Sequence, residues 1–104
     1  MTSANSEANR IRLFRMDGEE YRSVYLYLED DGGLRLLGHD MGPSVERCWG
    51  DDDYEFWVEI KPHAVRQLAF ALLRDRYAGR EDAVDEFRKF CEQDAIEHVS
   101  DSWV

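Results

Sequence analysis

The hydrophobic period of this chain changes near Pro62, and this change is the strongest constraint on its fold. Before Pro62, apolar side chains alternate with polar or aromatic ones over residues 10–16, 21–28, 34–37 and 54–60, as they do in half-buried strands. After Pro62 they recur every three or four positions, which is the period of an amphipathic helix. Strands followed by helices are typical of α+β domains. We therefore predict a four-stranded antiparallel sheet followed by two helices packed on one of its faces.

The helical part carries its own start and stop signals. Pro62 suits a first helical turn, because the N–H that proline lacks would have no partner there. Gly79 is expected just past the end of the first helix, where a left-handed residue is common. A second helix is predicted from about Arg80, with an apolar stripe that reaches Cys91. We expect Trp103, near the end of the sequence, to pack against the domain.

The length of 104 residues fits one domain. We predict a flexible tail at residues 1–9 and a single domain at residues 10–104. The N-terminal segment MTSANSEANR has no apolar run like that of a secretory signal, and no stretch approaches the roughly 20 apolar residues that span a bilayer. Cys48 and Cys91 are too few for a disulfide framework. These features favour a reducing compartment, and we expect the cytoplasm.

The charge balance narrows the classes of partner. The chain has 13 basic and 23 acidic side chains, for a formal net charge of -10. An acidic surface repels nucleic acids and anionic lipids. We therefore expect no membrane partner, disfavour nucleic acid, and favour another protein or a second copy of this chain.

Alternation places the side chains of the predicted sheet on two different faces. The face predicted to meet the helices is almost entirely aliphatic and comprises Val24, Leu26, Leu28, Leu34, Leu36, Phe56, Val58 and Ile60. The opposite face is rich in arginine and aromatic rings and comprises Arg10, Arg12, Phe14, Tyr25, Tyr27, Arg35, Leu37, Trp57, Glu55 and Glu59. Contiguous apolar patches are rare on free surfaces, so we expect something to cover this second face.

The sequence leaves three alternatives for what covers this second face. The second helix, the loop after the third strand or the C-terminal tail could lie on the face. A homodimer could form through it, since aromatic residues and arginine are enriched in interfaces. The rings could also stack the bases of a single-stranded nucleic acid; in its order of elements the chain resembles the single-stranded-DNA-binding transcriptional coactivator domain. The interface residues that we predict are Tyr25, Tyr27, Trp57, Arg12 and Arg35.

A second candidate site is a long loop expected within residues 38–57, because long loops kept in compact domains are often functional. If the third and fourth strands are neighbours, His39 and Asp40 approach the acidic run at the start of the fourth strand. Oxygen ligands suit calcium or magnesium, and carboxylates raise the pKa of a nearby histidine. Acidic runs are also common in solvated turns, where His39 would be a structural hydrogen-bonding residue. The candidate ligand-binding residues are His39, Asp40, Asp51, Asp53, Glu55 and Trp49.

Motifs for catalysis and for cofactor binding are absent from the sequence. It contains no P-loop, no GxGxxG, no HExxH and no GxSxG. The acidic run does not have the spacing of an EF-hand loop. We therefore assign no catalytic residue, no metal and no cofactor, and we favour an interaction module over an enzyme.

The strings LGHDMGPSVERCWGDDDYEFW and SDSWV resemble a family of small bacterial proteins. In that family a GHD-G segment, a WG-acidic-YE segment and a C-terminal tryptophan recur. The resemblance covers most of the chain after Glu20, and it transfers no catalytic residue because the family has no established activity. It implies a set of residues that meet in space, namely Gly38, His39, Asp40, Gly42, Trp49, Gly50, Tyr54, Glu55 and Trp103.

Overall fold

The computed structural model describes residues 9–50 and 53–103. The chain divides into two compact units, Met1–Leu68 and Ala69–Val104, and each is described by itself. The tail predicted at residues 1–9 lies, apart from Asn9, outside the described residues. The single domain predicted for residues 10–104 stays a prediction.

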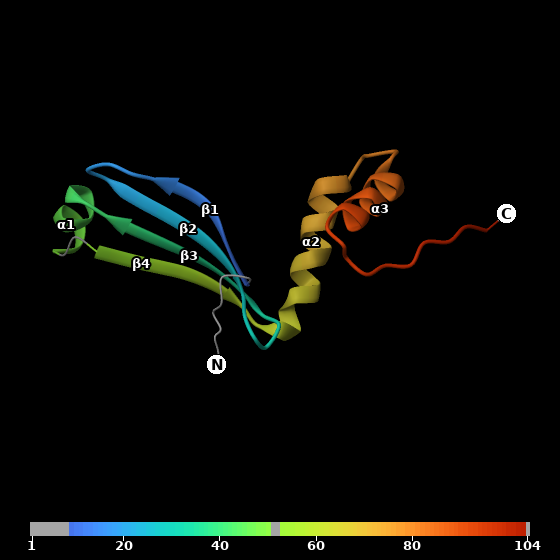
Figure 1. The fold of residues 1–104 in the computed structure, drawn as a ribbon, viewed down its shortest axis with the longest axis horizontal. Coiled ribbons are helices and arrows are strands. Elements are labelled where there is room, and N and C mark those ends of the chain that lie inside the picture. Colours follow the sequence, from blue (N-terminus) through green and yellow to red (C-terminus); the bar gives the residue numbers. More distant parts are fainter. Residues whose placement is uncertain (1–8, 51–52, 104) are drawn as a thin grey trace. The chain divides into compact units, whose positions relative to one another are not determined.

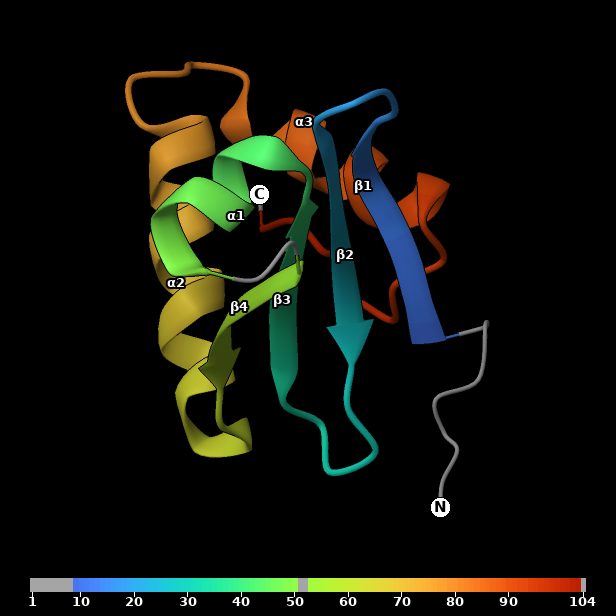
Figure 2. The same cartoon turned by 90° about the vertical axis from the view of Figure 1, so that its left-hand side faces the viewer.

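The first unit is built on one antiparallel sheet. Its strands are β1 (Arg10–Met16), β2 (Tyr21–Leu28), β3 (Leu34–Met41) and β4 (Asp53–Ile60). They lie side by side in chain order, β1-β2-β3-β4 (Figures 1 and 2). This sheet, followed by helices, confirms the predicted α+β class with a four-stranded antiparallel sheet.

A β-bulge in β1 changes one predicted face. Arg12 pairs with Tyr25, but the next pair joins Phe14 to Val24, so Leu13 is an extra residue in β1. An extra residue shifts every later side chain to the other face of the sheet. The prediction that Phe14 lies with the arginines was therefore wrong, and Phe14 lies on the aliphatic face with Val24.

The prediction of a long loop after Leu37 was also wrong. β3 continues to Met41, a short helix α1 follows at Pro43–Trp49, and β4 begins at Asp53. Gly42 precedes the helix with φ 129°, and Gly50 ends it in the left-handed conformation with φ 76°. Val45 on α1 is only 7% exposed, so this segment has a packed side chain of its own.

The helices after the sheet begin and end close to the residues predicted from Pro62, Gly79 and Arg80. A 3₁₀ turn at Pro62–Ala64 leads into α2 (Val65–Tyr77), which continues from the first unit into the second, and α3 spans Ala83–Gln93. Gly79 has φ 76°, as expected for a residue just past a helix end. The packing of both helices on one sheet face stays a prediction. No helix within residues 9–50 and 53–103 is long and apolar enough to cross a bilayer.

The second unit packs through the facing sides of α2 and α3. The rings of Tyr77 and Phe87 meet edge to face with centroids 5.9 Å apart, and Cys91 is 3% exposed, as its place in the apolar stripe predicts. Beyond α3, the Ile96 N–H donates to the Cys91 carbonyl at 2.8 Å. Trp103 is 98% exposed, so the expectation that it packs against the domain was wrong for the described structure.

Candidate interaction surface of the sheet

One face of the sheet gathers arginines, aromatic rings and glutamates in three cross-strand rows, because directly paired residues of antiparallel strands share a face. We call it the arginine–aromatic face. In order from β1 to β4, the first row is Arg10, Tyr27, Arg35 and Glu59; the second is Arg12, Tyr25, Leu37 and Trp57; the third is Arg15, Ser23, His39 and Glu55. All five predicted interface residues therefore lie on this one face.

Two arginines lie over the tyrosines of this face. The Arg10 Cζ atom is 4.6 Å from the ring centroid of Tyr25, and the Arg35 Cζ atom is 4.6 Å from that of Tyr27. Both tyrosines are half-buried. Cation–π contacts of this kind contribute about 0.5–1 kcal/mol at exposed sites. Part of the expected cover of the tyrosines therefore comes from arginines of the same face.

Trp57 is the open aromatic residue of this face. It pairs with Leu37 across the strands, and its side chain is 58% exposed. A tryptophan buries a large apolar area when a partner covers it. Of the residues of this face, Trp57 would therefore bury the largest apolar area on contact with a partner.

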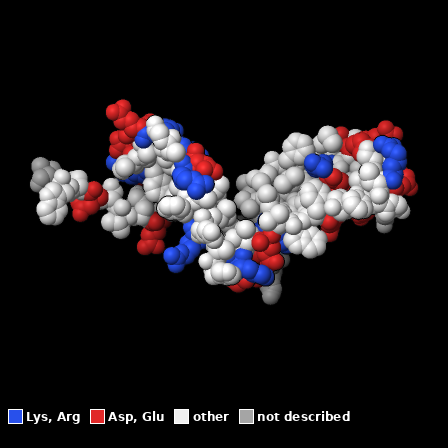
Figure 3. Space-filling view, turned by 180° about the vertical axis from the view of Figure 1, so that it is seen from behind, with Lys and Arg blue, Asp and Glu red and all other residues white. Residues whose placement is uncertain are grey.

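Charge changes sign across the arginine–aromatic face. β1 contributes Arg10, Arg12 and Arg15, whereas β4 contributes Asp53, Glu55 and Glu59. In the view of Figure 3 the basic and acidic side chains of each unit are intermixed rather than gathered into one field of a single sign. This pattern differs from the uniformly basic surface that tracks a nucleic-acid backbone.

The β-bulge adds Arg15 to this face; unbroken alternation from Arg10 and Arg12 misses it, although the adjacent apolar residues Leu13 and Phe14 mark the interruption. Arg15 pairs with Ser23, and its Cζ atom is 5.8 Å from the ring centroid of Tyr21. Its side chain also donates to Asp17 at 3.0 Å. This hydrogen bond, together with the charge of Asp17, raises the pKa of Arg15, which keeps its positive charge in place.

His39 lies on the arginine–aromatic face and is held by one of the predicted ligand residues. Its Nε2 atom is hydrogen-bonded to the Asp53 carboxylate, and the ring of Tyr21 meets it edge to face with centroids 6.1 Å apart. Glu55 is its cross-strand neighbour on β4. The structure therefore brings together His39, Asp53 and Glu55, three of the predicted ligand-binding residues.

Asp40 lies on the opposite, aliphatic face and is already engaged. Arg22 donates from Nε and Nη2 to its two carboxylate oxygens, each at 2.6 Å. The pKa of Arg22 is raised, first by this hydrogen bond and then by the charge of Asp40. This two-pronged contact occupies two of the acceptor positions of the carboxylate. Asp40 is thus separated from His39 by the thickness of the sheet.

Trp49 also lies apart from His39, in a column of rings on the aliphatic face. Its ring stacks on Tyr54 with centroids 5.0 Å apart, and Tyr54 stacks on Phe56 at 5.3 Å. This column ties α1 to β4. The sequence pattern does not indicate this column, because it predicts a loop where α1 is found.

The predicted ligand site is therefore divided between the two faces, and Asp51 lies outside the described residues. Among residues 9–50 and 53–103, no three histidine, cysteine or acidic side chains are grouped as metal ligands would be. The residue set implied by the family resemblance is divided in the same way, with His39 and Glu55 on one face and Tyr54 and Trp49 on the other; Trp103 belongs to the second unit.

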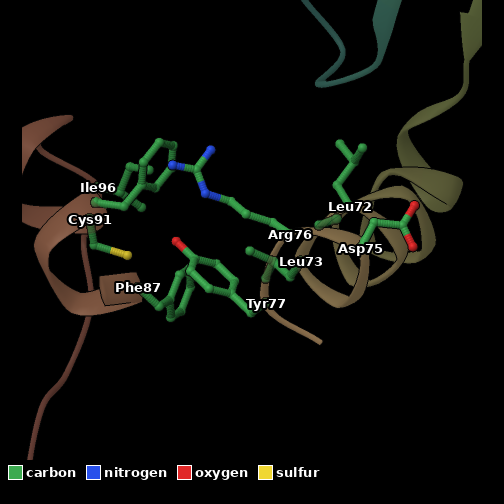
Figure 4. A pocket seen from close by; sticks show the side chains of 10 residues that line it. Leu72, Leu73, Asp75, Arg76, Tyr77, Phe87, Cys91 and Ile96 are labelled. Carbon is green, nitrogen blue, oxygen red and sulfur yellow. The ribbon is translucent and has the colours of Figure 1, made fainter. Parts of the chain in front are cut away.

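The second unit has an open apolar groove of about 630 Å³. Figure 4 shows Leu73 and Tyr77 of α2 and Phe87 and Cys91 of α3 converging on it. The guanidinium group of Arg76 lies 5.0 Å from the ring centroid of Phe90, another lining residue. The groove is almost entirely apolar, so it can bury an apolar side chain but offers little chemistry for a reaction.

The chain was compared with models of protein families, with curated proteins and with solved structures, and none of these comparisons finds a match.

Proposed function

We propose that the protein is an interaction module whose working surface is the arginine–aromatic face. The observation that carries this proposal is the gathering of Arg12, Tyr25 and Trp57 in one cross-strand row, flanked by Arg10, Tyr27 and Arg35. Tryptophan, tyrosine and arginine are the residues that most often dominate the binding energy of protein interfaces.

The state of the other candidate residues supports binding rather than catalysis. His39 is engaged by Asp53, and Asp40 is engaged by Arg22 on the other face. A histidine held by a carboxylate can still act as a general base through its other ring nitrogen, but it needs a proton donor within reach, and among the described residues His39 has no hydrogen bond to a hydroxyl or thiol group. We therefore propose no catalytic role for these residues, and no cofactor or metal.

A protein partner is favoured over nucleic acid by the charges on the face itself. Glu55 and Glu59 lie in the same rows as the arginines and would meet the phosphates of a strand laid across the sheet. The net charge of -10 adds a general repulsion. We propose a cytoplasmic location, supported by the two free cysteines, Cys48 and Cys91. Membership in the family of small bacterial proteins remains part of the same proposal.

A photocrosslinking experiment tests the proposed surface. Benzoylphenylalanine is placed at position 57, or at the exposed helical position 66 as a control, and each chain is irradiated both pure and in an extract of the source cells. We expect covalent protein adducts from position 57 that disappear when Arg12→Glu is added, and none from position 66. If position 57 yields no protein adduct in either sample, or if its adducts are indifferent to Arg12→Glu, the proposal is wrong.

A binding experiment with an oligonucleotide tests whether the partner is a nucleic acid instead of a protein. We expect a short fluorescent single-stranded oligonucleotide to show no saturable binding at low salt. Binding that falls steeply with salt and is lost in Trp57→Ala would replace the proposed function by nucleic-acid recognition.

A further inference from the structure

We infer that the partner of the arginine–aromatic face is the same face of a second copy of this chain, related to it by a two-fold axis that runs along the strands. This inference rests on the proposed function and names its partner. It follows from the charges and rings of the face, because a two-fold interface must be complementary to itself.

The direction of the axis decides which strands meet. A two-fold axis parallel to the strands, lying between the two sheets, reverses the strand order and keeps each residue at its level along the strand. β1 then lies over β4 of the partner subunit, and each cross-strand row lies over the same row. Packed sheets cross at about 30° and lie about 10 Å apart, so the long side chains that end each row can reach across.

The outer positions of the first and third rows then pair opposite charges. Arg10 faces the partner's Glu59 in the first row, and Arg15 faces the partner's Glu55 in the third row. By symmetry, Glu59 and Glu55 face the partner's arginines. The interface therefore carries four pairs of opposite charge, two from each unique pairing.

Most of the remaining positions pair rings with cations or with apolar side chains, and Ser23 faces the partner's His39 in the third row. In the first row Tyr27 faces the partner's Arg35, and in the second row Arg12 faces the partner's Trp57. Tyr25 faces the partner's Leu37. A guanidinium over a tryptophan face is among the most favourable cation–π arrangements, and it would cover the 58% of Trp57 that is now exposed.

The alternative axis, perpendicular to the strands, is opposed by the same residues. It would lay β1 on β1 of the partner subunit and β4 on β4. Arg12 would then face the partner's Arg12, and glutamates would face glutamates across the outer rows. Like charges brought together in an interface cost several kcal/mol, so the face itself selects the axis along the strands.

The present ion pairs of Arg15 and Glu59 do not oppose this arrangement. Arg15 pairs with Asp17 at 3.0 Å, and Glu59 pairs with Lys61 at 3.4 Å. Side chains in both pairs are well exposed, and exposed pairs contribute only about 0–1 kcal/mol. They can be exchanged for, or shared with, charges of the partner.

A charge-swap experiment tests both the partner and the axis. One variant carries Arg10→Glu and Arg15→Glu, which makes the outer positions of both edge strands acidic; the other carries Glu55→Arg and Glu59→Arg, which makes them basic. Sedimentation equilibrium is run on the wild type, on each variant alone, and on their equimolar mixture. A control carries Arg47→Glu and Arg66→Glu, which makes outside the face the same change of net charge as the Arg10→Glu and Arg15→Glu variant.

We expect a wild-type dimer, a dimerisation at least about tenfold weaker in each charge-swapped variant, and recovery in the mixture, where every outer pair is again of opposite charge. The control should dimerise like the wild type. Circular dichroism checks that each variant is folded; if a double variant is not, the single variants Arg15→Glu and Glu55→Arg, both at exposed positions, replace it.

Other outcomes overturn the inference in distinct ways. A wild type that stays monomeric at millimolar concentration removes the second copy as partner, while the proposed function survives if crosslinks from position 57 to another protein persist. Variants that dimerise as well as the wild type would show that the dimer uses another surface or, if their mixture dimerises more strongly than the wild type, that the axis runs across the strands. Variants that fail alone and also fail to recover in the mixture would contradict the axis along the strands.

Discussion

Gly38 lies at a point of the sheet where no side chain fits. A Cβ atom at this position would collide with the ring of Phe56, its cross-strand partner on β4. The ring lies across the glycine because it continues the stack formed by Tyr54 and Trp49. The absence of a side chain at residue 38 therefore lets the ring column hold α1 against the sheet.

Substitution of this glycine should be costly. We predict that Gly38→Ala lowers the free energy of unfolding by roughly 1–3 kcal/mol, because the added methyl group overpacks the space that the Phe56 ring fills. Urea unfolding followed by circular dichroism measures the change. In a Phe56→Leu background the same substitution should cost much less, since the collision is relieved. Equal costs in both backgrounds would contradict this explanation.

At the level of elements, the alternating segments were the most predictable part. β2 was predicted at residues 21–28 and is found there, because its period of two is unbroken. β3 was predicted to end at Leu37 but runs to Met41, since pairing with β2 and β4 overrides the poor strand propensity of Gly38, His39 and Asp40. Tertiary pairing of this kind cannot be read from local composition.

The candidate sites were likewise predictable only where the strands continue without a bulge and end where the local sequence indicates. Alternation placed Tyr25, Tyr27 and Trp57 on one face correctly, because all three lie on strands without a bulge. It misplaced Phe14 and missed Arg15, because an unbroken period of two ignores the adjacent apolar residues Leu13 and Phe14, which interrupt the alternation at the bulge. The predicted ligand site failed for a related reason: His39 and Asp40 are adjacent on a continuing strand, so their side chains point to opposite faces.

The start of α3 carries a pH-sensitive ion pair. Arg80 donates to the Asp82 carboxylate from Nε at 3.0 Å and from Nη2 at 2.9 Å, and this hydrogen bond lowers the pKa of Asp82. A lowered folded pKa adds stability above the ordinary carboxyl pKa, and this stability is lost as the pH falls through the folded value.

The pair gives a prediction for acid titration. In Arg80→Gln, the pKa of Asp82 should rise toward the ordinary carboxyl value, as followed by NMR of the side-chain carboxyl carbon. The melting temperature of the variant should also fall less than that of the wild type between about pH 5 and pH 2. Arg66→Gln, a change at another exposed arginine of the helical region, serves as the control and should leave Asp82 unaffected. An unchanged Asp82 titration in Arg80→Gln would show that the pair does not form in solution.

For the whole molecule, the distribution of charge matters more than its total. A chain with a net charge of -10 keeps three arginines on one edge strand of its sheet, where they share a face with tyrosine and tryptophan rings. The other face of the sheet is aliphatic, and Val58 there is 65% exposed. The two faces therefore offer different chemistry: the aliphatic face suits an apolar cover, and the arginine–aromatic face suits a partner with both carboxylates and rings.

The central claim, that the arginine–aromatic face is an interface between two copies of this chain, is tested most directly at Trp57. In a variant with Trp49→Phe and Trp103→Phe, Trp57 is the sole tryptophan, and acrylamide quenching of its fluorescence reports its exposure to water. We predict strong quenching in dilute solution and protection that rises with protein concentration in step with the mass of the particle. A Trp57 that is quenched equally at every concentration while the protein is dimeric, or one that is protected in a monomer, would contradict the claim.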